Sequence, residues 1–205
     1  MTYKTEQEKF WAGNFGSEYI GRNKGEKWIA SNLALFSKIL GSTKSVASVL
    51  ELGANIGLNL HAIRGLIPEA SLTAVEINEE AVNELRKFDY IEPVFSSILD
   101  FKPAKKWDIV FTKGVLIHLN PDVLPDVYDL MYRASNRYIL VCEYYNPSPV
   151  EIPYRGHSGR LFKRDFAGEI LKGHADISLV EYGFAYHNDP NFPQDDLSWF
   201  LMEKS

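Results

Sequence analysis

The stretch from Val46 to Leu60 constrains the fold of this chain more than any other. Its first half is a short apolar run rich in β-branched residues, which is typical of a strand buried on both faces. The run ends at Gly53, and the residues from Gly57 onward read as a helix. A strand that turns into a helix through glycines presents backbone N–H groups and the positive end of the helix dipole to a ligand. Because glycine has no Cβ, a ligand can approach the backbone there. The stretch predicts an α/β fold with a ligand site at this turn.

A dinucleotide-binding loop is the obvious alternative. Its Gly-x-Gly-x-x-Gly pattern requires glycine at positions 55 and 58, where this chain has Asn55 and Leu58. The spacing present is Glu51, Gly53 and Gly57, which resembles the first motif of class I S-adenosylmethionine-dependent methyltransferases. The resemblance implies that S-adenosylmethionine is the cofactor and that Glu51, Gly53, Asn55 and Gly57 bind it. An ordinary tight strand–helix turn remains the structural alternative.

The next predicted strand, residues 72–77, ends in an acid. Glu76 follows Gly57 by 19 residues. In nucleotide-binding α/β folds an acid about 20 residues past the glycine loop accepts hydrogen bonds from the ribose hydroxyls. A carboxylate suits a diol because it only accepts hydrogen bonds. We therefore expect Glu76 and the adjoining Ile77 to bind the cofactor, with a solvent-exposed strand-end glutamate as the alternative.

Residues 91–95 are predicted to form a third strand, and the residues after it concern the adenine. In many related methyltransferases an Asp at this place binds the adenine amino group. By the simplest alignment that position is Ser97, so the chain departs from the common pattern. Ser97 can still accept a hydrogen bond, or the backbone of Ile98 can read the base.

Residues 5–23 alternate aromatic residues with glycines, a composition unfavourable to a helix. We interpret them as an ordered N-terminal flap that closes over the cofactor, with Tyr19 or Arg22 near its carboxylate. The alternative is a terminal arm that Trp11 and Phe15 anchor. A helix follows and stops at Gly41. The chain is thus expected to form one domain, with residues 1–41 as flap and helix covering the cofactor site and residues 42–205 as the core.

The fourth predicted strand, residues 107–114, runs into a segment that contains His118. Residues just past the carboxyl end of a strand line the ligand crevice in doubly wound sheets. Lys113 is therefore predicted to bind the cofactor, and His118 becomes a possible catalytic residue. A lysine paired with a nearby carboxylate and a histidine satisfied at a helix start are the respective alternatives.

The fifth predicted strand, residues 137–143, feeds a long loop that is stiffened by prolines and dense in Tyr, Asn, Arg and His. Loops of this length are usually functional or disordered. Positive charge gathers beyond the loop around a helix start, where the dipole disfavours cations, and this favours an anionic ligand. Alternatively, Glu151, Asp165 and Glu169 neutralise the charge. The predicted substrate-binding residues are Tyr144, Tyr145, Asn146, Tyr154, Arg155, Lys163 and Arg164.

Two last strands, residues 177–187 and 197–203, follow without an intervening helix. Five strands alternating with helices and then a β-hairpin form the strand pattern of class I methyltransferases. The predicted fold class is α/β, a single-domain Rossmann-like class I methyltransferase fold. It has a seven-stranded, mostly parallel sheet with an antiparallel last strand and helices on both faces.

Several strings together resemble one methyltransferase family over nearly the whole chain. They are Phe-Trp-Ala-Gly-x-Phe-Gly-x-x-Tyr-Ile (10–20), Phe-Thr-Lys-Gly-Val-Leu-Ile-His (111–118), Glu-Tyr-Tyr-Asn-Pro-Ser-Pro-Val-Glu-Ile-x-Tyr-Arg-Gly-His (143–157), Leu-Phe-Lys-Arg-Asp-Phe-Ala-Gly-Glu (161–169) and Tyr-Gly-Phe-x-Tyr-His-x-Asp-Pro-x-Phe-Pro-Gln-Asp-Asp (182–196). They are similar to the methylases associated with pseudaminic acid biosynthesis. The resemblance implies methylation of a small sugar acid, or its nucleotide-activated form, in a bacterial nonulosonic-acid pathway for surface polysaccharide or flagellar glycan.

The acceptor atom is a hydroxyl or a nitrogen. A sugar hydroxyl needs a base with a near-neutral pKa, for which His118 and His157 are the natural candidates and Glu143 a secondary one. An amine acceptor needs less help. Two further readings stay open: a small-molecule O-methyltransferase outside sugar metabolism, and a binding module that holds S-adenosylmethionine without catalysis.

Composition limits the partners. The net charge of -5 excludes a broad electrostatic footprint for nucleic acid. The single cysteine, Cys142, excludes an intrachain disulfide and a cysteine-rich metal site, so no metal is expected. No stretch approaches ~20 apolar residues, and the N-terminus carries no apolar signal segment. We expect a cytoplasmic protein with a small-molecule substrate and no nucleic-acid or membrane partner. Its oligomeric state does not follow from the sequence.

Overall fold

The computed structural model describes residues 2–22 and 25–205, in which a seven-stranded sheet forms the centre. The strand order is β3-β2-β1-β4-β5-β9-β8. The strands are β1 (Ser48–Leu52), β2 (Ser71–Glu76), β3 (Ile91–Phe95), β4 (Trp107–Lys113), β5 (Ser135–Glu143), β8 (Ile177–Ala185) and β9 (Leu197–Lys204). Strands β1 to β5 pair in parallel, and β9 pairs antiparallel with both β5 and β8. The predicted fold class is confirmed.

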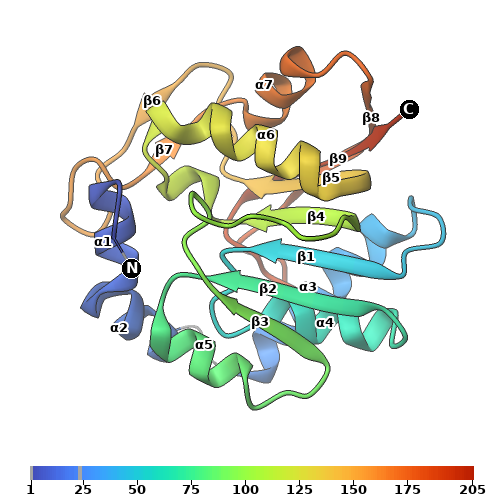
Figure 1. Ribbon diagram of the computed structural model, residues 1–205, viewed down its shortest axis with the longest axis horizontal. Coiled ribbons are helices and arrows are strands. Elements are labelled where there is room, and N and C mark those ends of the chain that lie inside the picture. The colour runs from blue at the N-terminus through green and yellow to red at the C-terminus, as the bar shows by residue number, and fades with distance from the viewer. Residues whose placement is uncertain (1, 23–24) are drawn as a thin grey trace.

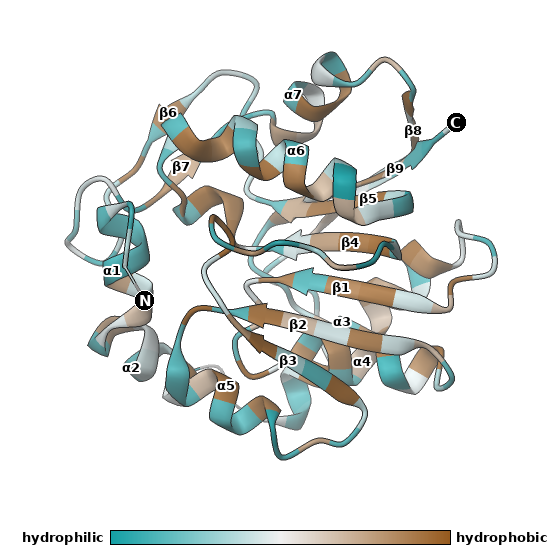
Figure 2. Cartoon of the chain, in the orientation of Figure 1, coloured by the Kyte–Doolittle hydropathy of each residue, from teal (hydrophilic) through white to brown (hydrophobic). Residues whose placement is uncertain are grey.

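Helices cover both faces of the sheet (Figure 1). One face carries α3 (Glu26–Leu40), α4 (Leu58–Leu66) and α5 (Glu79–Leu85), and the other carries α6 (Leu124–Ala134) and α7 (Phe166–Gly173). Successive strand residues point to opposite faces, so Val49 lies in the α3–α4 layer and Leu50 in the α6–α7 layer. The strands are accordingly apolar along most of their length (Figure 2). This double burial explains the continuous apolar runs in the sequence.

Two short helices, α1 (Glu6–Ala12) and α2 (Asn14–Arg22), lie at the carboxyl ends of the parallel strands (Figure 1). We call these two helices the lid. The expectation that this glycine-rich segment resists helix formation is wrong. Thr5 and Glu8 form a capping box: the Thr5 side chain accepts from the backbone N–H of Glu8, and the Glu8 carboxylate accepts from that of Thr5. Residues 1, 23 and 24 of the predicted flap lie outside the described residues.

Helix α3 contributes residues both to the hydrophobic core and to the pocket. Leu35, Phe36 and Ile39 are buried in the core layer against the sheet, whereas Trp28 and Asn32 line the pocket described below. The predicted boundary at residue 41 therefore separates segments that share one core.

The long connection after β5 is ordered by a two-stranded ribbon, β6 (Val150–Glu151) and β7 (Phe162–Lys163). Two 3-10 turns, η1 (Leu116–His118) and η2 (Pro121–Val123), link β4 to α6. None of the helices that the described residues form is long and apolar enough to cross a membrane.

Candidate functional site

A pocket opens at the carboxyl ends of the central strands, beneath the lid. The lid contributes its helix faces, and the loops after β1, β2, β3 and β4 contribute the floor. The lining residues are Gln7, Glu8, Trp11, Gly16, Tyr19, Trp28, Asn32, Gly53, Ala54, Asn55, Ile56, Leu58, Asn59, Val75, Glu76, Ile77, Asn78, Ser97, Ile98, Leu99, Lys113, Gly114, Val115, His118, Leu119 and Asp195. The pocket therefore lies where the sheet topology predicts a ligand crevice.

The backbone of the glycine loop is held by β2. The N–H groups of Gly53 and Ala54 both donate to the carbonyl oxygen of Val75, at 2.8 and 3.1 Å. Gly53 has a φ of 79°, and a Cβ there would lie 2.7 Å from a methyl group of Val115. Glycine is thus required at this position by the backbone conformation and by the packing of Val115.

Gly57 serves packing rather than the ligand. It has a φ of 81° at the N-terminus of α4, and a Cβ there would lie 2.7 Å from a methyl group of Leu85. Gly57 does not line the pocket. We correct the expectation that it lets a ligand approach the backbone: it allows α4 to begin close to α5.

Glu51 is completely buried beneath the pocket, behind Asn59. Its Oε1 accepts a hydrogen bond of 2.6 Å from Asn59 Nδ2, and its Oε2 has no hydrogen-bond partner within residues 2–22 and 25–205. Burial raises the pKa of Glu51 to about 8, although the Asn59 bond acts in the opposite direction. Glu51 therefore holds its proton at neutral pH.

This raised pKa predicts how stability depends on pH. The folded state keeps a proton that the unfolded state loses above the ordinary value of 4.5, so the contribution of Glu51 to stability is complete below pH 4.5 and is lost as pH rises to about 8. Glu51→Gln should remove this dependence. The free energy of unfolding of the variant should therefore exceed that of the wild type by a margin that grows between pH 5 and pH 8. Urea unfolding at several pH values measures it, with the exposed Glu79→Gln as control. If the free energies of unfolding of the wild type and of Glu51→Gln differ by the same amount at every pH, the raised pKa of Glu51 is contradicted.

Glu76 ends β2 with its carboxylate facing the pocket. One oxygen accepts from the N–H of Asn55 at 2.7 Å, and the other accepts from the N–H groups of Ile77 and Asn78, both at 2.8 Å. Burial raises the pKa of Glu76, and these three hydrogen bonds oppose that shift. A carboxylate offers about four acceptor positions, so one position remains for a ligand donor.

Asn78 connects this end of the pocket to the lid. Its Oδ1 caps α5 by accepting from the N–H of Ala81, and its Nδ2 donates to the carbonyl oxygen of Trp11 at 3.2 Å. A Cβ at Gly16 would lie 1.9 Å from that same carbonyl oxygen and 3.0 Å from Asn78 Nδ2. Glycine at position 16 therefore allows α2 to lie close to the Trp11 carbonyl group of α1 and to Asn78.

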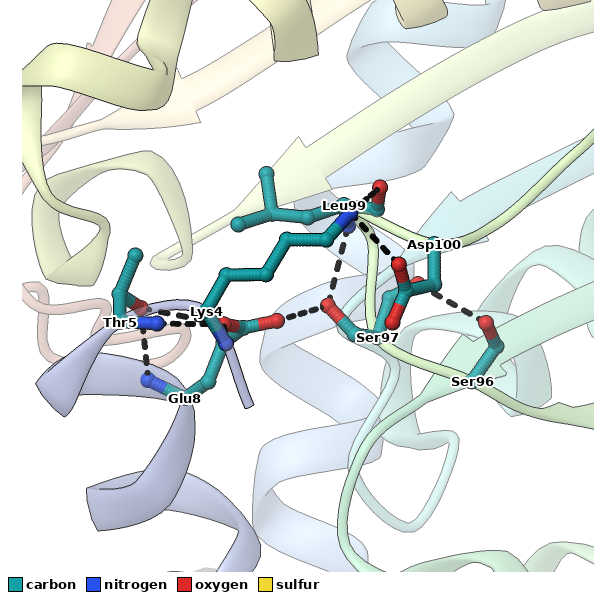
Figure 3. A network of polar contacts seen from close by, with 7 residues as sticks. All are labelled: Lys4, Thr5, Glu8, Ser96, Ser97, Leu99 and Asp100. Carbon is teal, nitrogen blue, oxygen red and sulfur yellow. Dashed lines mark hydrogen bonds and ion pairs between the residues drawn. The ribbon is translucent and has the colours of Figure 1, made fainter. Parts of the chain in front are cut away.

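The loop after β3 carries Ser97 and Ile98, which both line the pocket as predicted residues of the adenine end. Ser97 is buried, and its hydroxyl donates to Glu8 and accepts from the N–H of Leu99 at 3.0 Å (Figure 3). Glu8 belongs to the lid and was not among the predicted site residues. The capping-box spacing Thr5-x-x-Glu8 announced a helix start but not this contact.

Lys113 and Tyr19 also line the pocket, and both lie within electrostatic reach of Asp195. Burial lowers the pKa of Lys113, while the Asp195 and Glu51 carboxyl groups act to raise it. Within the part of the chain that the structure describes, Lys113 forms no ion pair, which does not fit the alternative of a paired lysine. Burial also raises the pKa of Tyr19 to about 12, so its hydroxyl keeps its proton and can donate.

His118 lies in η1 with its ring between those of Trp11 and Tyr154, at centroid distances of 4.8 Å from each. Its Nδ1 lies 2.6 Å from the carbonyl oxygen of Arg160. A carbonyl only accepts, so Nδ1 carries the proton and Nε2 carries a lone pair. Burial lowers the pKa of His118 to about 4, which keeps the ring neutral near pH 7.

Glu143 does not fit the role of a base. Its buried carboxylate accepts from the N–H groups of Val115 and Leu116 at 3.0 Å and of Ile117 at 3.4 Å. Burial raises its pKa to about 7. Glu143 also does not line the pocket, so we correct this expectation: it anchors the loop between β4 and η1.

His157 is exposed on the connection after β5 and does not line the pocket. Its ring packs edge-on against Phe10 of the lid at a centroid distance of 5.2 Å. The two predicted histidines therefore occupy different places, and only His118 faces the ligand crevice.

None of the predicted substrate-binding residues lines the pocket, although all are described by the structure. Tyr154 contacts the pocket wall, because its ring packs on His118 and on Phe15 of the lid. Tyr145 is exposed and lies beside Phe200.

The positively charged residues that follow the loop after β5 make contacts within the protein. Arg164 is paired with Glu169 at 2.7 Å, so its assignment to an anionic ligand is corrected in favour of neutralisation. Arg155 lies over the Tyr154 ring and Lys163 over the Tyr144 ring, while Asn146 donates to the carbonyl oxygen of Ser148. Arg155 remains exposed and can still meet a ligand outside the pocket.

Several buried polar atoms in the pocket wall have no hydrogen-bond partner among the residues that the structure describes. They are Gln7 Oε1, Trp11 Nε1, Asn55 Oδ1 and Asn59 Oδ1. Leaving a buried polar atom unpaired costs about 1–3 kcal/mol, so such a set points to a polar ligand. Trp11, Asn59 and Gln7 are further residues that the sequence analysis missed, because single polar residues on helices give no local signal. Across residues 2–22 and 25–205, no group of three or more His, Cys, Asp or Glu side chains is arranged to hold a metal ion.

Comparisons with known proteins identify the fold. No family model matches the chain, and a search of curated proteins finds no relative. Among solved structures, the plantazolicin methyltransferase BpumL in complex with S-adenosylhomocysteine is similar, with a TM-score of 0.67 and 15% identity over 97% of this chain and 94% of that one. The glycopeptide N-methyltransferase MtfA in complex with S-adenosylhomocysteine gives 0.65 and 14% over 86% and 90%. At this identity the similarity shows a class I methyltransferase fold.

Proposed function

We propose that this chain is an S-adenosylmethionine-dependent methyltransferase. The main support for this proposal is the position of the Glu76 carboxylate. It lies in the pocket at the end of β2, beside the loop that contains Gly53, with one acceptor position unused. This arrangement suits a ribose diol in a fold whose solved examples hold S-adenosylhomocysteine.

The remaining pocket residues fit the rest of the cofactor. Glu76 and Ile77 would hold the ribose, and Ser97 and Ile98 would line the adenine end of the pocket. Asn55 Oδ1 and Asn59 Oδ1 are unpaired acceptors that suit the ammonium group of the methionyl part. Lys113, the Trp11 Nε1–H and the Tyr19 hydroxyl are donors that suit its carboxylate.

The bound cofactor supplies a methyl group on a sulfonium: the carbon–sulfur bond breaks as a bond to an acceptor oxygen or nitrogen forms. The protein holds the acceptor in line and removes its proton. His118 is the proposed base, since its Nε2 lone pair is available in the pocket and takes that proton. Its lowered pKa makes it a weaker base than the near-neutral one expected from the sequence. The lid excludes water from the site.

Calorimetry tests the proposal directly. Titration with S-adenosylmethionine and S-adenosylhomocysteine should give saturable binding at one site per chain, and NAD should give none at the same concentration. Preferential binding of NAD would overturn the cofactor assignment. Binding without turnover on every acceptor tried would favour the non-catalytic module.

The proposed acceptor is a small sugar acid of the nonulosonic or pseudaminic type, or its nucleotide-activated form, in a cytoplasmic pathway without nucleic-acid or membrane partners. Two features support it: the strings that resemble those of pseudaminic-acid-associated methylases, and the exposed cation of Arg155, which lies over the ring of Tyr154 beside His118. If the acceptor is anionic, Arg155→Ala should raise its KM far more than that of a neutral analogue, and rising salt should slow turnover of the anion only. Equal effects on both acceptors would contradict an anionic substrate.

A nitrogen acceptor is the second candidate, because Asp195 lines the pocket near Lys113 and offers a carboxylate to an amine. MtfA, one of the similar structures, is a glycopeptide N-methyltransferase. Parallel assays with amine and hydroxyl forms of one acceptor separate the two candidates.

A further inference from the structure

The lid helix α1 brings a carboxylate to the loop after β3. Glu8 is 5% exposed and lines the pocket. Its Oε2 accepts from the N–H groups of Lys4 and Thr5, at 2.6 and 2.8 Å. Its Oε1 accepts from the Ser97 hydroxyl, 89 residues away, so one acceptor position of Oε1 remains (Figure 3).

Ser97 itself has little left to offer a ligand. Its one hydroxyl proton is directed to Glu8, and one lone pair accepts the N–H of Leu99. The group at this end of the pocket that can accept strongly is therefore the Glu8 carboxylate. It is brought there by tertiary packing of the lid.

The loop after β3 is where a nucleoside base would lie. β3 is the neighbour of β2, and Ser97, Ile98 and Leu99 line the pocket beyond Glu76. A ribose held at Glu76 directs its base to these residues and to Glu8 above them. Adenine carries a donor amino group at its C6 position, whereas a 6-oxo purine carries an acceptor there.

We propose that Glu8 of the lid accepts a hydrogen bond from the 6-amino group of the cofactor's adenine and makes the site specific for 6-amino purines. This inference rests on the proposed function. It means that a lid residue completes the base site, so cofactor binding and lid closure stabilise each other. The lid also has an attachment outside the pocket: Lys4 Nζ donates to the carbonyl oxygen of Leu99 and pairs with Asp100 at 2.6 Å (Figure 3).

The test uses calorimetry to compare two ligands that differ at this position and at the adjoining N1, S-adenosylhomocysteine and its deaminated analogue S-inosylhomocysteine. The wild type should prefer the adenosyl ligand by about 10-fold or more, as expected for a hydrogen bond to a charged group. Glu8→Gln keeps the capping box, because glutamine serves at that position as well. Its amide N–H₂ would then face the base, so adenosyl affinity should fall about 10- to 100-fold and the preference should shift to the inosyl ligand.

Lys4→Ala is the matched control, since it loosens the same helix from outside the pocket and leaves the carboxylate in place. It should weaken both ligands by the same small factor and leave their ratio unchanged. The ratio is informative even for a variant with a partly open lid, because an open lid lowers both affinities alike.

Two results would overturn the inference while S-adenosylmethionine binding stands: equal affinity of the wild type for both ligands, or an unchanged ratio in Glu8→Gln. A wild-type protein that binds neither S-adenosylhomocysteine nor S-adenosylmethionine would remove the proposed function together with this inference.

Discussion

Replacing Glu76 by alanine should weaken S-adenosylhomocysteine binding by about 100-fold, near the upper end of the loss expected when one charge-assisted hydrogen bond to a ligand is removed. The substitution removes the proposed ribose acceptor. It also releases the N–H groups of Asn55, Ile77 and Asn78, which the carboxylate holds at 2.7 to 2.8 Å. Since Asn78 also donates a hydrogen bond to the lid, the substitution should weaken the attachment of the lid as well as the ribose site.

The measurement is calorimetry on folded variants, with circular dichroism to verify the fold. Glu76→Gln keeps the shape but replaces one acceptor oxygen with a donor, so its affinity should lie between those of the wild type and Glu76→Ala. Glu80→Ala, an exposed acid in the first turn of α5, should bind like the wild type. A folded Glu76→Ala protein with undiminished affinity would remove Glu76 from the cofactor site.

Replacing His118 by glutamine should lower turnover of a hydroxyl acceptor by about 10²- to 10⁴-fold, the range of general base catalysis. The Arg160 carbonyl fixes the Nδ1–H tautomer and leaves the Nε2 lone pair for the acceptor. Glutamine retains polarity but cannot take up a proton. Binding of S-adenosylhomocysteine should be little changed, because the loss falls on the proton transfer and not on the cofactor contacts.

The histidine outside the pocket provides the control for this prediction. His157→Ala should reduce turnover far less than His118→Gln, since the His157 ring packs on Phe10 and Phe15 outside the pocket. The wild-type rate should decline as pH falls toward 4, where His118 takes up a proton, and should not decline at pH 6. Equal losses in the two variants would contradict base catalysis by His118, and a decline centred near pH 6.5 would contradict its lowered pKa.

The sequence by itself determined the sheet and the floor of the site. Runs such as residues 46–52 are apolar on both faces, which only a doubly covered parallel strand explains. Since parallel strands end at one edge, the positions of Gly53, Glu76 and Lys113 at strand ends predict that they lie in one crevice. These inferences are local or depend on topology alone, and the structure lines its pocket with all three residues.

Only the tertiary structure decided how the lid covers the site and which partners the charged residues have. The Glu8–Ser97 contact joins residues 89 positions apart, and the Glu143 carboxylate is consumed by backbone N–H groups 26 to 28 positions away. Arg164 could equally have met a ligand or Glu169 until packing brought the two side chains to 2.7 Å. A side chain's charge is encoded locally, but its partner depends on which distant segments pack together. The hydrophobic burial that decides such packing is non-directional, and so it leaves no pairing signal in the sequence.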